Sequence, residues 1–337
     1  MKRNAGVAAL ALAAGLAVLV IGLEAGGFDA ILALGALWRG AFGSWDALSS
    51  ATLVRATPLI VIGLGFALGL RAGALNIGAE GQFYAGAIGA TWVGVMAAGW
   101  SAPLAIGASW AAAMAAGALW ILVPVVLRLR FGVLEVISTL LLNFVAEALV
   151  SLMVQGPLQE HTRVYPQSEP IAAAARLPML PGTRLHLGFA AALLLAAVLW
   201  YVFARTVWGF RLRAAGLGPR AALVSGRVDV PRLTAVALLW SGAIAGLAGG
   251  VEVGGVSYAL YQNLSPGYGF TAIAVALLAR LRPFWIVASG ILFGALEAGA
   301  GGMQREAGVP AVAVYVVEAV IIIVILLADA LARRRAR

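Results

Sequence analysis

The sequence predicts an all-α protein: a polytopic bundle of about ten transmembrane helices with both termini in the cytoplasm. Of the 337 residues, 63% are hydrophobic and only 11% are charged, and the mean hydropathy is +0.99. Soluble domains are usually about 45–50% apolar and about 25% charged, so lipid must cover apolar surface that this chain cannot bury in a core of its own. The 42 glycines fit close contact between helices in such a bundle.

Ten apolar stretches predict the spans, because a helix needs about 20 residues to cross the hydrocarbon core. They lie near residues 5–23, 51–70, 78–97, 103–127, 133–154, 187–205, 233–256, 268–280, 284–301 and 309–329. The first apolar run is longer than the roughly 7–15 residues of a signal peptide, and we interpret it as a retained helix. The eighth and ninth stretches are short, and they fit either two helices or one broken helix.

The basic residues predict the orientation. With cytoplasmic termini, 17 of the 23 lysines and arginines lie on the cytoplasmic side, which is the usual bias. The exceptions are Arg39, Arg55, Arg163, Arg176, Arg184 and Arg305. The net charge of +9 is explained in this way, and we expect no nucleic acid partner because no basic patch is interleaved with aromatic residues.

Three polar segments interrupt what we expect to be a single transmembrane domain of residues 1–337. Residues 24–50 combine aromatic and charged side chains, which suits a short amphipathic helix lying in the interface on the external side of the membrane. Residues 156–186 contain five prolines and predict a long ordered loop on the outer face. Residues 206–232 contain five arginines and one aspartate and form the longest predicted cytoplasmic loop.

Several kinds of chemistry are excluded by composition. The chain has no cysteine, which excludes disulfides, thiolate catalysis and iron–sulfur clusters. Its two histidines, His161 and His186, have no metal-ligand partner at helical spacing, so we predict no metal site. Lys2 is the only lysine, so the chain has no phosphate-binding P-loop. No nucleophile–base arrangement is present either, and we predict no catalytic residue.

Acidic residues at bilayer depth are the main departure from the apolar pattern. Burying one costs about 2.5–3.5 kcal/mol on insertion scales, so such residues face a bundle interior or a water-filled path. Those in or near the predicted spans are Glu80, Glu135, Glu147, Glu252, Glu297 and Glu318. For each, a structural hydrogen bond and a place on a transport path remain open.

The stretch Arg71–Ala90 is the most polar of these places. It contains Asn76, Glu80 and Gln82, with Gly73, Gly78, Gly81 and Gly86 around them. A helix would stack Asn76 and Glu80 on one face, since they are four residues apart. The glycines favour a broken or tightly packed helix, which is a common way to build a site at membrane depth.

Four sequence blocks resemble the permease subunits of bacterial ABC importers for nucleosides and simple sugars, of the branched-chain amino acid and ribose type. They are Gly73–Gln82 ("GALNIGAEGQ"), Glu135–Ala146, Ser241–Gly255 and Leu264–Arg280. Their order is the family's order, and together they cover the chain from about residue 50 to residue 325. One departure is Leu134, where the family pattern has a polar residue.

The resemblance implies roles for particular residues. The substrate path is expected to include Asn76, Glu80, Gln82, Phe83, Asn143, Glu252 and Phe270. Contact with the ATPase is expected from Gly216, Arg220, Ala221, Ala222 and Gly226, of which the last three form an Ala-Ala-x-x-x-Gly motif. Arg220 replaces the glutamate that usually precedes this motif. The small residues would let a short helix enter a groove on the partner, with Gly226 ending it.

The same resemblance implies partners and a location. We expect an ATPase subunit that binds the ATP, a second permease subunit in a heterodimer, an external substrate-binding lipoprotein and the lipid bilayer of the bacterial inner membrane. The chain itself is expected to bind no cofactor and to make no covalent bond. An ion-coupled secondary transporter of a small neutral solute is the alternative, since intramembrane carboxylates and a broken helix suit it as well.

Overall fold

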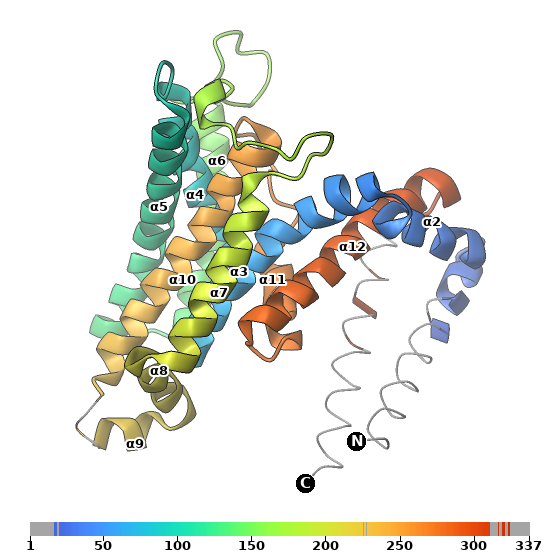
Figure 1. The fold of residues 1–337 in the computed structure, drawn as a ribbon. Helices are drawn as coiled ribbons and strands as arrows, with labels where there is room; N and C mark the ends of the chain where they lie inside the picture. Colours follow the sequence, from blue (N-terminus) through green and yellow to red (C-terminus); the bar gives the residue numbers. More distant parts are fainter. Residues whose placement is uncertain are drawn as a thin grey trace. The chain divides into compact units, whose positions relative to one another are not determined.

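The computed structural model describes residues 17–18, 20–224, 226, 228–310, 316, 319–320 and 323, and every regular element among them is a helix (Figure 1). In chain order the elements are α2 (Ala30–Phe42), η1 (Ala47–Thr52), α3 (Leu53–Arg71), α4 (Ala79–Met96), α5 (Ala102–Phe131), α6 (Glu135–Val154), η2 (Ala173–Ala175), α7 (Leu187–Arg205), α8 (Val207–Leu217), α9 (Pro219–Val224), α10 (Val230–Glu252), η3 (Val253–Ser257), α11 (Tyr268–Leu278) and α12 (Pro283–Ala307). The all-α prediction is confirmed for this part of the chain.

Six of the helical segments are long and apolar enough to cross a membrane. They are Ala47–Arg71, Ala102–Phe131, Glu135–Val154, Leu187–Arg205, Val230–Ser257 and Pro283–Ala307. Helices α4 and α11 also lie in predicted spans, but α4 is diluted by polar residues and α11 has only 11 residues. The predicted spans 5–23 and 309–329 fall mostly outside the described residues. The multi-pass character is therefore confirmed, and the total of ten spans stays a prediction.

The short stretches near residues 268–301 are two helices. Helix α11 ends at Leu278 and α12 begins at Pro283. Between them Arg280 and Leu281 have φ values of 51° and 58°, in the left-handed region that non-glycine residues rarely adopt. This turn reverses the chain within four residues.

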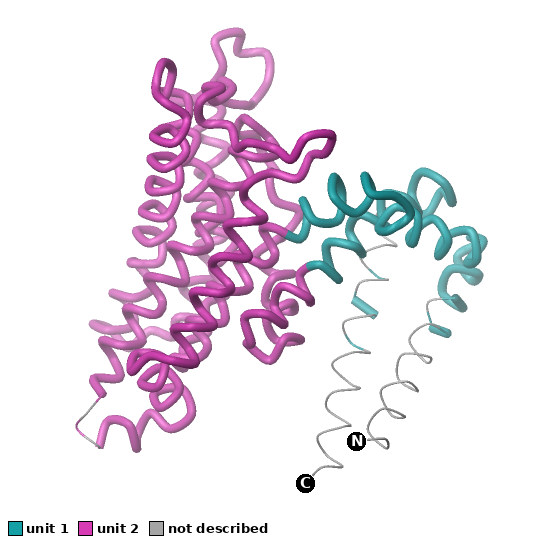
Figure 2. Tube along the Cα trace, in the orientation of Figure 1, with its two compact units in different colours: residues 1–56, 291–337 teal, residues 57–290 magenta. Residues whose placement is uncertain are grey.

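The chain divides into two compact units, which Figure 2 shows in different colours. One contains residues 1–56 and 291–337, and the other contains residues 57–290. In the first unit, α2 begins at Asp29, whose side chain accepts a hydrogen bond from the backbone N–H of Leu32. Alanines bury the inner face of α2, and Arg39 forms an ion pair with Glu306 at 2.6 Å. The helix expected within residues 24–50 is therefore present.

In the second unit, α4, α5 and α10 form the centre, and each packs against the other two. Their backbones touch at glycines. A Cβ atom on Gly86 would lie 2.1 Å from the carbonyl oxygen of Gly246, and one on Gly246 would lie 2.3 Å from that of Ala113. Any larger residue would force these helices apart, so glycine sets the distance between the helix axes.

We predict that Gly246→Ala destabilises the fold, because the added methyl group has no space between α10 and α5. The cost of overpacking is about 1–3 kcal/mol. Thermal unfolding of the purified protein in detergent measures it. The matched control is Gly107→Ala in α5, where a Cβ would meet nothing within 4 Å. Equal melting temperatures for the two variants would contradict the packing argument.

Candidate functional site

The polar stretch around Asn76 is a break between two helices. Helix α3 ends at Arg71, α4 begins at Ala79, and the backbone between them is not helical. Gly73 has φ +80°, and the N–H of Ala74 donates to the carbonyl of Gly69 at 3.1 Å, which closes the end of α3. The predicted stacking of Asn76 and Glu80 on one helical face is therefore wrong, because Asn76 precedes the helix. The non-helical segment lies between the predicted spans 51–70 and 78–97, which end and begin within a residue of α3 and α4.

Asn76 and Gln82 form a reciprocal pair of amides. The Asn76 Nδ2 donates to Gln82 Oε1 at 2.8 Å, and Gln82 Nε2 donates to Asn76 Oδ1 at 2.9 Å. Asn76 also donates to the Ser241 hydroxyl of α10 and accepts from the backbone N–H of Gly78. Both side chains are buried, so these bonds satisfy amides that would otherwise be costly at this depth.

Asn143 of α6 forms two hydrogen bonds with the backbone at the start of α4. Its Oδ1 accepts from the N–H of Gly81 at 2.8 Å, and its Nδ2 donates to the carbonyl of Ile77 at 2.9 Å. The first N–H groups of a helix have no partner within the helix, and a buried helix end needs side chains to supply one. Asn143 does so from a neighbouring helix.

Glu80 joins α4 to α11. Its Oε2 accepts from the backbone N–H of Gly269 at 2.6 Å, in the first turn of α11, where the helix dipole favours a negative charge. A Cβ on Gly269 would lie 2.3 Å from the backbone nitrogen of Glu80, so only glycine allows this approach. The carboxylate is buried and holds the two helices at contact distance.

The remaining expected path residues lie around the same helices. Phe83 is fully buried, with its ring centroid 5.8 Å from that of Tyr84 and 5.9 Å from that of Tyr268. Glu252 is buried at the end of α10, and its charge together with burial raises the pKa of Tyr261, burial being the larger cause. Phe270 differs from the others, because 45% of it is exposed.

Three further polar contacts stabilise the non-helical segment between α3 and α4 from neighbouring helices. The Thr234 hydroxyl of α10 donates to the carbonyl of Ala72 at 3.2 Å, and the Leu75 N–H donates to Glu135 Oε1 at 3.3 Å. Glu135 is paired with Arg128 at 2.7 Å. These roles of Thr234 and Glu135 were not predicted from the sequence. Glu135 and Ser241 are the first residues of two of the sequence blocks that resemble the permease family, and this resemblance was the sequence signal for their importance.

The loop 206–232 is largely helical. It contains α8, α9 and the start of α10, and the short helix expected around Arg220, Ala221 and Ala222 is α9. Gly226 follows it with φ +66°, in the conformation that commonly ends a helix. Gly216 of α8 lies against the end of α3, where a Cβ would sit 2.3 Å from the carbonyl oxygen of Arg71. The loop therefore touches the chain directly beside the break.

The loop 156–186 is ordered by backbone and side-chain bonds. Glu160 accepts from the side chains of Thr162 and Gln167, each at 2.7 Å. The N–H of Ser168 donates to the carbonyl of Leu260, and that of Leu177 donates to Gly254, both at 2.8 Å. The loop therefore covers the end of α10 and the segment that follows it.

Comparison with known proteins gives a consistent result. The family described as the permease component of branched-chain amino acid transport systems matches residues 48–326. The guanosine ABC transporter permease protein of Bacillus subtilis is 35% identical over 320 residues, 91% of each chain. The glucose ABC transporter permease protein of Haloferax volcanii is 35% identical over 98% of this chain and 89% of its own. The nucleoside ABC transporter permease protein NupB of Lactococcus lactis is 30% identical over 88% of this chain and 83% of its own. No solved structure matches the chain significantly.

We predict that Glu80→Ala lowers the stability of the fold and that Glu80→Gln lowers it less, because glutamine keeps an acceptor for the N–H of Gly269. Losing a charged acceptor of a buried N–H costs about 1–3 kcal/mol. Thermal unfolding in detergent measures the effect. Glu147→Ala, at an exposed position on α6, is the control. If Glu80→Ala melts like Glu147→Ala, the carboxylate does not hold α11.

Proposed function

Because this chain belongs to the permease family of branched-chain amino acid transport systems, we propose that it forms the path for a nucleoside or a related simple sugar through a bacterial ABC importer. The chain is an ABC transporter permease subunit. The observation that carries the proposed substrate class is its similarity, along most of its length, to permeases named for guanosine, nucleosides and glucose. Family membership also favours this function over an ion-coupled secondary transporter.

The site supports a division of labour among the residues proposed for the path. Asn76 and Gln82 are bonded to each other, Asn76 also to Ser241, and Asn143 to backbone groups, so these amides fix the shape of the proposed path. Glu80 and Glu252 are also buried, and the Phe83 ring packs between α4 and α11. The exposed ring of Phe270 offers an apolar face suited to a nucleobase or a sugar ring.

We propose that residues 206–232 contact an ATPase subunit, through α9 and the residues around it. Among the exposed apolar side chains of this loop, three lie at the end of α8 and in α9: Leu217 is 90% exposed, Val224 is 88% exposed and Leu223 is 56% exposed. Exposed apolar residues clustered in this way are typical of a surface that a partner covers. Gly216 gives α8 its close contact with α3, and Gly226 ends α9. Arg220, Ala221 and Ala222 belong to the same proposed contact surface.

The rest of the assembly follows from the same proposal. ATP is bound by the partner ATPase, a second permease subunit forms a heterodimer with this chain, and an external lipoprotein delivers the substrate to the side that carries residues 156–186. The chain crosses the inner membrane ten times with both termini in the cytoplasm, and residues 24–50 lie at the outer interface. The whole chain then acts as one permease domain, and it catalyses no reaction.

We predict that deleting this chain abolishes uptake of the transported solute in cells that carry its full gene cluster, since no other subunit spans the membrane at its place in the complex. Uptake of labelled guanosine, adenosine, glucose and ribose measures it, with the chain restored from a plasmid as the control. We expect uptake of at least one nucleoside or sugar to fall to background. Accumulation of solute by vesicles that contain this chain alone, driven by an ion gradient, would overturn the proposal.

We predict that, in cells that make this chain without its partner subunits, a cysteine at Tyr165 reacts with a membrane-impermeant maleimide, whereas a cysteine at Val224 reacts only after permeabilisation. Both side chains are exposed, and the natural chain has no cysteine, so each single substitution gives an unambiguous label. Gel shift of the labelled protein measures the reaction. The opposite pattern would reverse the proposed orientation without affecting the family assignment.

A further inference from the structure

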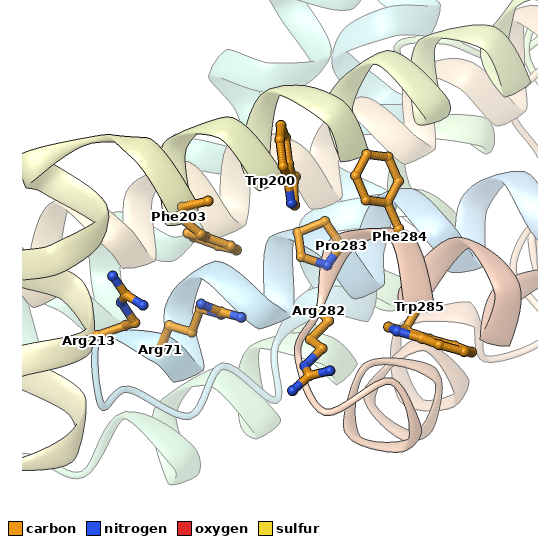
Figure 3. A pocket seen from close by; sticks show the side chains of 9 residues that line it. Arg71, Trp200, Phe203, Arg213, Arg282, Pro283, Phe284 and Trp285 are labelled. Carbon is orange, nitrogen blue, oxygen red and sulfur yellow. The ribbon is translucent and has the colours of Figure 1, made fainter.

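Arginine and aromatic side chains line a cavity of about 320 Å³ at one end of the helices of the second unit (Figure 3). Its walls come from the last residue of α3, the end of α7, helix α8 and the start of α12. In the view of Figure 3, three arginines lie along one side of the cavity and the rings of Trp200, Phe203 and Phe284 lie along the other. The arginines are Arg71, Arg213 and Arg282.

The positive charge in this cavity is uncompensated. Arg213 and Arg282 both repel the guanidinium of Arg71 electrostatically. Among the described residues, none of these three arginines forms an ion pair with a carboxylate. The first N–H groups of α12 add partial positive charge, since a helix N-terminus leaves them without partners. The arrangement therefore favours an anion.

Arg71 is held in place before any ligand binds. Its Nε and Nη2 donate to the carbonyl oxygen of Leu281 at 3.1 and 2.8 Å, and its Cζ lies 4.2 Å from the centroid of the Phe203 ring. A guanidinium has five N–H donors, so three remain for another acceptor. The left-handed turn at Arg280 and Leu281 presents that carbonyl and then starts α12. Arg213 and Arg282 are exposed and can close on a ligand.

The depth of the cavity indicates where the anion comes from. Arg71, the last turn of α7 and Pro283 are each at an end of a segment long enough to span a membrane, so the cavity lies at the boundary between lipid and water. Trp200, Phe284 and Trp285 are 43%, 53% and 62% exposed, and the rings of Trp200 and Phe284 are 5.7 Å apart. Tryptophan is enriched at this level of a membrane, where headgroup phosphates lie.

We propose that this cavity is a binding site for a phosphate group, supplied by the headgroup of an anionic phospholipid. Arginine recognises phosphate through charge-assisted hydrogen bonds, and basic pockets between membrane helices hold anionic headgroups in this way. The lipid would connect α8 to α3 and α12 at the point where loop 206–232 meets the membrane. The proposal does not depend on the identity of the transported solute.

Native mass spectrometry tests this site. The full chain in detergent is mixed with phosphatidylglycerol or phosphatidylcholine, and the amount of bound lipid is measured. We expect phosphatidylglycerol to bind at least tenfold more tightly than phosphatidylcholine. We expect Arg213→Gln/Arg282→Gln to remove that preference, because each interfacial arginine contributes about fivefold. The matched control is Arg205→Gln/Arg211→Gln, which removes two exposed charges from α7 and α8 outside the cavity. An unchanged preference in the first variant, or an equal loss in the control, would overturn the site.

Two further arms complete the experiment. Adding glycerol 3-phosphate or inorganic phosphate distinguishes a lipid headgroup from a soluble phosphate as the ligand. If millimolar concentrations do not displace phosphatidylglycerol, the ligand is a lipid. Displacement at micromolar concentrations would overturn the lipid assignment in favour of a soluble phosphate. Quenching of tryptophan fluorescence by brominated lipids needs no variant. We expect stronger quenching by brominated phosphatidylglycerol than by brominated phosphatidylcholine, and equal quenching would count against the site.

Discussion

The backbone between α3 and α4 sets the constraint on which the rest of the second unit depends. Residues 72–78 are not helical and several of them are buried, so water cannot reach their N–H and C=O groups and these groups must find partners in the protein. Here the partners are Thr234 for the Ala72 carbonyl, Glu135 for the Leu75 N–H and Asn143 for the Ile77 carbonyl. They come from α10 and α6, so the break is stable only when these helices are assembled around it.

Short polar side chains can meet this need only if the helices are very close together. Ser, Thr and Asn reach a few ångströms from their own backbone, and a wide interface would leave their donors unpaired. The contacts at Gly86, Gly246 and Gly269 remove the space that a Cβ atom would take. Glycine content and intramembrane polarity, which look like independent properties of the composition, are therefore two parts of one solution.

The sequence was sufficient for the parts of this arrangement that depend on local composition. Hydropathy located the six long apolar segments, and the predicted spans 51–70 and 78–97 left the residues around Asn76 outside a helix. The spacing of Asn76 and Glu80 misled, because the i, i+4 rule applies only if the helix continues through both residues. Their partners on other helices, Ser241 and Gly269, are more than 160 residues away in the chain, and no local pattern encodes such pairs. The division between residues 280 and 284 was predicted, but the left-handed backbone of Arg280 and Leu281 was not, since neither residue is a glycine.

The position of α8 gives the break a mechanical connection to the loop that follows α7. Gly216 lies against the carbonyl of Arg71, Arg71 is bound to the carbonyl of Leu281, and Thr234 is bound to that of Ala72. Backbones in direct contact cannot slide past one another without opening a void, and packed interiors respond to force by moving as blocks. A pull on α8 would therefore reach α3, the start of α10 and the turn before α12 together. The bond from Thr234, which satisfies one carbonyl of the non-helical segment, is thus also one of the contacts through which a force on the loop would be transmitted to it.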